Sequence, residues 1–217
     1  MEPITLTICG IALLLTATTA AAYKQYEAVQ SKNRQIEAIR KSLQGYVMTY
    51  TAEAADVTMI DNCRNFIKST FGDGIDETFN RLDTVEQREQ LAVQTAREMA
   101  GIMGINVREV LIDDLGLCTR GYTQQCEDGV KVVLNRAVML ADPQQLVKTM
   151  CHELRHCVQL SALQNDNPWG FSDARLAQWL YSWVNYIPGE QQDAYEGYAT
   201  QAIETDASWF ASRVFPE

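Results

Sequence analysis

The sequence predicts an α+β protein in which helices precede and follow a small β-sheet. Two β-branched runs, 106–114 (NVREVLIDD) and 129–140 (GVKVVLNRAVML), are typical of strands, and a stretch containing glycine and cysteine separates them. Segments on both sides of this pair show the helical spacing of apolar residues. With 217 residues and no internal repeat, the chain is long enough for one domain with an extension, or at most two small domains.

The helices expected before the strands have sequence signals at their ends. Helical patterning covers about 54–70 and breaks at FGDGID, where two glycines indicate a loop. The segment 84–104 predicts the next helix, because Thr84 and Gln87 fit a capping box. After the strands, 141–163 predicts a long helix that begins with an Asp-Pro pair, a favourable N-cap followed by proline at the first helical position.

Two further helices are expected near the C-terminal end, at 174–184 and 193–215. The N-terminal end differs in character, because residues 4–22 carry no charge and 23–50 are polar and helix-favouring. The sequence therefore divides into a hydrophobic segment (1–22), a polar helical stalk (23–50) and a main domain (51–217).

The uncharged segment 4–22 predicts contact with a membrane. Its nineteen residues approach the roughly 20 that a spanning helix requires. Glu2 stands where a signal peptide normally has a basic residue, and five basic residues follow the segment. An uncleaved single-pass anchor with a cytoplasmic-facing domain is therefore favoured. The alternatives are a signal peptide cleaved after the small residues 20–22, which would make the protein secreted, and a buried helix.

The charge distribution disfavours nucleic acid as a partner. The formal net charge is −10, and residues 51–217 carry thirteen basic against twenty-five acidic residues, about −12. A surface this acidic repels phosphate backbones. We therefore expect no nucleic-acid binding.

The six cysteines leave the redox compartment open. Cys118 and Cys126 flank TRGYTQQ, a turn-like stretch that would let them form a hairpin disulfide. The alternative is that all six are free thiols packed as small apolar side chains in a reducing cytosol.

The stretch TMCHELRHCVQ contains the only two histidines of the chain, His152 and His156. Residues four apart lie on the same face of a helix, so both imidazoles can bind one Zn²⁺ ion. Glu153 would lie beside the first ligand, where it can reach a metal-bound water without binding the metal. The apolar residues fall on the opposite face and would anchor the helix in the core: Val147, Met150, Leu154 and Val158.

A catalytic zinc usually has three protein ligands, and here the third must come from elsewhere in the chain. Cys151 and Cys157 lie about 100° around the helix from the histidines and are expected to be structural. The best candidate is Glu204, at the edge of the apolar stripe of the last helix, and Asp206 is the runner-up, as a ligand or as a group that orients a histidine.

These residues resemble the gluzincin type of the zincin metallopeptidases, and more distantly the ImmA/IrrE-type domains. The match consists of His152-Glu153-Leu154-Arg155-His156 followed by Glu204-Thr205-Asp206-Ala207, and covers roughly 106–214. Many relatives have glycine where this chain has Arg155, for which we expect a nearby acidic partner. The resemblance implies a metallopeptidase-like domain with a zincin-like fold, in which a small sheet packs on the active-site helix.

The resemblance also implies a mechanism. Zn²⁺ bound by His152, His156 and Glu204 would activate a water, and Glu153 would act as general base on a peptide or protein substrate. The strand at 129–140 would align the substrate. Either Tyr195 or Tyr198 could stabilise the oxyanion, although simple aromatic packing is the favoured interpretation of both.

Three other hypotheses remain open at the level of sequence. One is a zinc-binding domain without catalysis, such as a sensor or a decayed metallopeptidase. Another is a membrane-anchored helical scaffold in which the His-Glu-x-x-His pattern is accidental. The third is a secreted toxin or cell-wall hydrolase that applies the same zinc chemistry to another amide.

Overall fold

The computed structural model describes residues 51–116, 119–126, 129–187 and 199–215. All of them belong to one compact unit, Tyr50–Glu217. The predicted hydrophobic segment 4–22 and the predicted stalk 23–50 lie outside the described residues. Within the described ranges, no helix combines the length and the apolar character that crossing a membrane requires.

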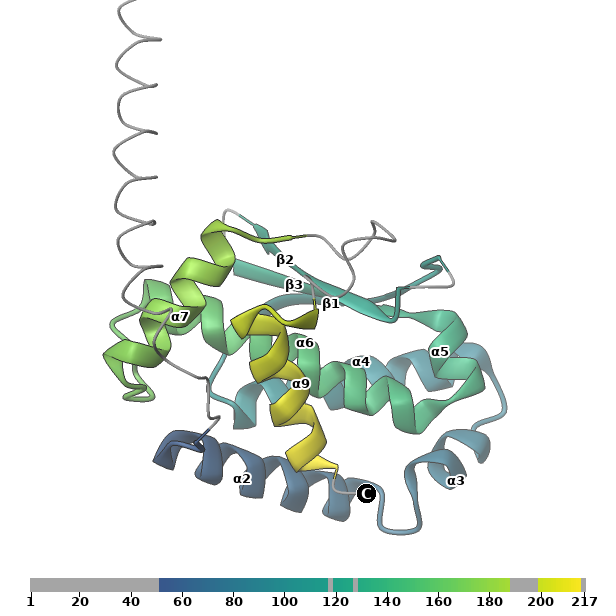
Figure 1. The fold of residues 1–217 in the computed structure, drawn as a ribbon. Helices are drawn as coiled ribbons and strands as arrows, with labels where there is room; N and C mark the ends of the chain where they lie inside the picture. The colour runs from purple at the N-terminus through teal and green to yellow at the C-terminus, as the bar shows by residue number, and fades with distance from the viewer. Residues whose placement is uncertain (1–50, 117–118, 127–128, 188–198, 216–217) are drawn as a thin grey trace, which may run out of the picture. The chain divides into compact units, whose positions relative to one another are not determined.

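The α+β class is confirmed, with seven helices and a three-stranded sheet among the described residues. In Figure 1, α4 and α6 lie on one face of the sheet, and α9 crosses α6. The elements are, in chain order, α2 (Ala54–Thr70), α3 (Ile75–Asn80), α4 (Val85–Ile102), β1 (Val107–Asp113), β2 (Gly121–Cys126), β3 (Gly129–Asn135), α5 (Arg136–Ala141), α6 (Pro143–Gln164), α7 (Asp173–Val184) and α9 (Ala202–Val214).

The sheet has the order β1-β3-β2. The central strand β3 pairs in parallel with β1 and antiparallel with β2. Both edges of β3 are therefore occupied, whereas β2 pairs on one side only among the described strands. The prediction that 129–140 aligns a substrate by strand pairing is wrong for this reason, and the outer strands β1 and β2 each have one unpaired edge among the described strands.

The stretch predicted as one strand over 129–140 is a strand followed by a helix. The strand ends at Asn135, whose side chain accepts a hydrogen bond from the backbone N–H of Ala137 at 2.9 Å and so caps α5. The same amide donates to backbone carbonyls of the preceding loop, at Leu115, Gly116 and Thr119. Val138, the one β-branched residue after the cap, is therefore helical despite its strand propensity.

The turn-like interpretation of TRGYTQQ is also wrong, because its residues 121–125 belong to β2. At Gly121 an added Cβ would lie 3.0 Å from the carbonyl oxygen of Val133 and 3.1 Å from the methyl of Thr149, so glycine allows a close approach of β2 to α6. Of the polar residues that suggested a turn, Gln124 and Gln125 are exposed, whereas Thr123 is half-buried and faces α6.

The helix predictions are confirmed more closely. The capping box of α4 is present, with Thr84 Oγ1 accepting from the N–H of Gln87 at 3.2 Å. Asp142 caps α6 and Pro143 is its first residue. Two details differ: the short helix α3 begins at Ile75, within the stretch FGDGID predicted as a loop, and the last helix begins at Ala202 rather than at 193.

Candidate metal centre

Helix α6 anchors its apolar face in the core and presents both histidines on another face. Val147, Met150, Leu154 and Val158 are all fully buried, as their spacing predicts. The side chain of His152 keeps about 20% of its surface exposed, whereas His156 is buried. One histidine is thus reachable from solvent while the other lies deeper between helices.

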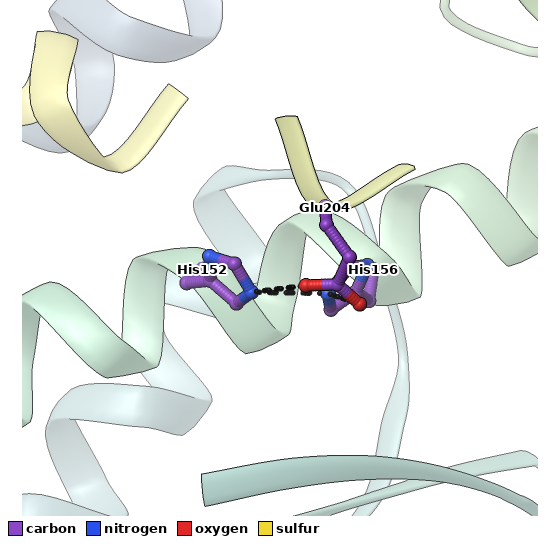
Figure 2. Close-up of side chains that lie close together, drawn as sticks. All are labelled: His152, His156 and Glu204. Carbon is purple, nitrogen blue, oxygen red and sulfur yellow. Dashed lines mark hydrogen bonds and ion pairs between the residues drawn. The ribbon is translucent and has the colours of Figure 1, made fainter. Parts of the chain in front are cut away.

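Helix α9 supplies a carboxylate to the same place. Its buried stripe contains Ile203, Ala207 and Phe210, and the small Ala207 permits close packing against α6. Glu204 lies at the edge of this stripe and is only 4% exposed. Figure 2 shows its carboxylate between the two imidazoles.

The three side chains converge on one point with spacings that fit a metal. His152 Nε2 lies 3.2 Å from Glu204 Oε2, and His156 Nε2 lies 3.5 Å from Glu204 Oε1. The two Nε2 atoms are 3.1 Å apart. Ligand atoms placed tetrahedrally about 2.0–2.1 Å from a zinc ion are about 3.3–3.4 Å from one another. His152, His156 and Glu204 are therefore a group that could hold a metal ion.

Burial and charge oppose each other at this group. Burial lowers the pKa of His156, but the hydrogen bond and negative charge of Glu204 outweigh it, with the charge of Glu153 adding, and the pKa rises to about 9. Burial raises the pKa of Glu204, but the hydrogen bonds and charges of the two histidines lower it well below its usual range. Glu204 is therefore ionised at neutral pH and suited to a cation.

Glu153 lies beside the cluster and faces the sheet. Its carboxylate Oε2 and its own backbone carbonyl oxygen each lie 2.9 Å from the hydroxyl of Thr123 in β2. Glu153 is 6% exposed, so this hydroxyl is an important partner. The sequence did not predict the contact between Thr123 and Glu153, because the segment around Thr123 was interpreted as a turn. Nothing in the sequence alone connects it to α6.

The runner-up ligand Asp206 is not part of the group. Its carboxylate is fully buried and accepts hydrogen bonds from Arg155 at 2.7 and 3.0 Å and from Arg175 at 3.0 Å. Arg155 also donates to Asp56 of α2 at 2.6 Å. The acidic partner expected for Arg155 is thus a pair of aspartates, Asp56 and Asp206.

The cysteines beside the histidines face away from the metal group. Cys151 Sγ lies 3.4 Å from the sulfur of Met99, and burial raises the pKa of the Cys151 thiol well above its usual value. Cys157 lines a separate cavity of about 200 Å³, and burial raises its pKa to about 12. Neither thiol is among the described residues that could hold the metal.

Two other sequence predictions concern residues that lie wholly or partly outside the described ranges. Cys126 is a free cysteine, and its predicted disulfide partner Cys118 lies outside the described residues. Tyr195 and Tyr198, considered for the oxyanion, also lie outside them.

The fold and the site together define an α+β protein with a candidate His₂Glu metal centre between two helices. No known protein family, curated protein or solved structure matches the chain. The function must therefore be argued from the geometry of the site.

Proposed function

We propose that the chain is a zinc-dependent, membrane-associated metallopeptidase with a zincin-like active site. The observation that carries the proposal is the convergence of His152, His156 and Glu204 at spacings of 3.1–3.5 Å, in a buried position between α6 and α9. Two imidazoles and one carboxylate form a donor set that suits catalytic zinc, with a fourth position left for water. Membrane association depends on residues 4–22 and stays a prediction.

Hydrolysis by this site would depend on three groups: the metal, Glu153 and Thr123. Bound zinc would supply a Lewis acid and a water whose pKa is about 7. Glu153 would accept a proton from the attacking water and deliver it to the departing nitrogen of the peptide. The hydroxyl of Thr123 holds the carboxylate of Glu153 in one orientation, which keeps the base pre-positioned.

The free edge of β2 suits the alignment of an extended substrate. Gly121 packs against Thr149 and Thr123 bonds to Glu153, so the strand and the helix run in the same direction past the site. A peptide that adds to the outer edge of β2 would form backbone hydrogen bonds along the metal group. Strand addition reads the backbone of the substrate rather than its side chains, so it tolerates many sequences.

A zinc-binding domain without catalysis is the second candidate function. The observation that favours it is that Glu153 already has a hydrogen-bond partner in Thr123, as a structural side chain would. This candidate keeps the same metal ligands and needs no substrate.

Metal analysis and peptide cleavage with matched variants test the proposal. We expect about one zinc per wild-type chain, loss of zinc in His156→Ala, and retention of zinc in Glu153→Gln. Hydrolysis of a peptide library should fall about 10²–10⁴-fold in Glu153→Gln, because the general base is gone. Glu98→Gln, an exposed glutamate on α4, is the control and should change neither quantity.

The outcomes separate the candidates. Zinc binding without cleavage of any peptide would favour the non-catalytic domain. Full activity in Glu153→Gln would eliminate Glu153 as the base. A protein that takes up no zinc even on addition would leave the His-Glu-x-x-His pattern as an accident of a helix.

A further inference from the structure

The second ring nitrogen of His156 has a buried partner that is not itself a member of the metal group. His156 Nδ1 lies 2.9 Å from Oε1 of Gln159, one helical turn further along α6. Gln159 is fully buried. The opposite ring nitrogen, Nε2, faces His152 and Glu204.

The orientation of the Gln159 amide follows from its other contacts. Its Nε2 lies 3.0 Å from the backbone carbonyl oxygen of Ile203 and 2.7 Å from Oδ2 of Asp206. Both of these are acceptors, so the NH₂ group must face them and the amide oxygen must face His156. Only a protonated Nδ1 can donate to that oxygen. In the neutral imidazole the hydrogen therefore lies on Nδ1, and Nε2 presents its lone pair to the metal group.

Asp206 is held firmly on the far side of Gln159. Arg155 and Arg175 donate three hydrogen bonds to its carboxylate, and all three side chains are at least nine-tenths buried. Because two guanidinium groups donate to it, the Asp206 carboxylate is ionised and can only accept a hydrogen bond. The amide of Gln159 must therefore turn its NH₂ group, not its oxygen, toward Asp206.

Gln159 also connects the two helices that carry the ligands. It lies on α6, three residues after His156, and donates to the carbonyl of Ile203 on α9, the residue before Glu204. One side chain thus contacts a ligand on one helix and the backbone beside a ligand on the other. A shift of α9 along α6 would break this contact and move Glu204 away from the imidazoles.

We propose that Gln159 is a positioning residue of the metal centre. It selects Nε2 of His156 as the ligand atom and fixes the register of α9 that brings Glu204 to it, with Asp206 as its anchor. The proposal rests on the proposed function to the extent that a metal binds at His152, His156 and Glu204. Groups that orient metal-binding histidines in this way typically change metal affinity about 10–100-fold when removed.

Replacement of Gln159 by methionine tests the role of the amide. Methionine has a similar volume and no strong donor or acceptor, so the packing is preserved while all three polar contacts of the amide are lost. We expect the Kd for zinc, measured by competition with a chelator, to rise about 10–100-fold in Gln159→Met. Gln164→Met, an exposed site on the same helix, should leave the Kd unchanged. Thermal unfolding of each metal-stripped variant shows whether it is folded.

Nitrogen NMR of the zinc-loaded protein gives a readout that a purely structural residue would not change. The chain has only two histidines, so the ring signals of ¹⁵N-histidine protein are few and assignable. His156 should show a zinc-bound Nε2 and a slowly exchanging Nδ1–H, and this proton should exchange rapidly in Gln159→Met. This readout on the wild-type protein needs no variant to fold.

The outcomes distinguish this inference from the proposed function. If the wild type binds zinc and Gln159→Met binds it equally well, the positioning role is overturned and the metallopeptidase proposal stands. Coordination of zinc through Nδ1 of His156 would overturn the positioning role in the wild type alone. If the wild type binds no zinc, both proposals fall.

Discussion

His156 shows at the scale of one residue how a buried carboxylate prepares a site for a cation. Glu204 raises the pKa of the imidazole to about 9 by offering it a negative charge in a buried position. The same charge that holds a proton on Nε2 would hold a metal ion there. Proton and metal therefore compete for one atom, and the competition can be measured.

We predict that zinc affinity rises with pH up to about 9. In metal-stripped protein below that pH, His156 is protonated, so zinc binding must release its proton and the affinity should increase about tenfold per pH unit. In Glu204→Gln the charge that raises the pKa is absent, so the rise should end near the usual histidine value of about 6.5 or below. Titration with a chelator at several pH values measures both. An affinity that is constant between pH 7 and pH 9 would contradict the protonated His156.

Single residues were predictable from the sequence where their partners lie within one helical turn. His152, Glu153 and His156 form a local pattern whose geometry follows from the helix alone. Thr123 and Gln159 were missed because their partners lie on other elements. Thr123 of β2 bonds to Glu153, 30 positions away on α6, and Gln159 of α6 bonds to the carbonyl of Ile203 on α9. Arg155 was noticed as unusual, but its partners could not be identified without the packing of α2 and α9.

At the scale of elements, a buried charge network joins four helices around Arg155. Its guanidinium bonds to Asp56 of α2 and Asp206 of α9, and Arg175 of α7 bonds to both aspartates. Two arginines and two aspartates leave the group neutral overall. The guanidinium carbon of Arg155 also lies 5.0–5.2 Å from the ring centroids of Phe171, Trp179 and Phe210. Such contacts stabilise a desolvated cation.

We predict that Asp56→Asn strongly destabilises the fold. The change removes one fully buried negative charge and leaves Arg155 with Asp206 as its acidic partner, while Arg175 keeps Asp206 and the half-buried Glu53 at 3.6 Å. Breaking a buried ion pair in this way typically costs about 3–5 kcal/mol. Asp61→Asn is the matched control on the same helix, because Asp61 forms only an exposed pair with Arg64 at 3.7 Å and should change the free energy of unfolding by less than about 1 kcal/mol. Urea unfolding of both variants measures the two changes in the free energy of unfolding. Equal stability of the two would show that the network contributes little.

Helices were more predictable than strands in this chain for a physical reason. The starts of α4 and α6 depend on local capping groups that are visible in sequence. The end of β3 depends on Asn135, whose amide bonds to a loop up to 20 positions away. The edge strand β2 has an exposed face and few apolar residues, so its pairing with β3 rather than its own pattern defines it.

At the scale of the whole molecule, the metal group and the side chains that support it lie together in one unit of the described chain. The metal group, Thr123 and the charge network lie in the unit Tyr50–Glu217, which has its own hydrophobic core. The order of the chain places the first ligands on α6 and the last on α9, so the site is complete only when these helices pack.

We predict that a fragment spanning 50–217 folds on its own and binds zinc as the full chain does. Its buried apolar residues and its buried charges find their partners within the fragment, which is the physical requirement for independent folding. A single cooperative thermal transition and a zinc content equal to that of the full chain are the expected results. A fragment that is unfolded, or that binds no zinc while the full chain does, would show that residues before 50 are part of the folded unit.

The side-by-side course of β2 and α6 constrains how this sequence can diverge. Two strand residues advance about 6.6 Å and four helical residues about 6 Å, so Gly121 meets Thr149 and Thr123 meets Glu153 in step. Inserting or deleting one residue between Gly121 and Thr123 would turn the side chain of Thr123 to the opposite face, away from Glu153. We therefore expect that homologous sequences can vary at the outward-facing residues of 121–126, whereas the length of this segment stays constant.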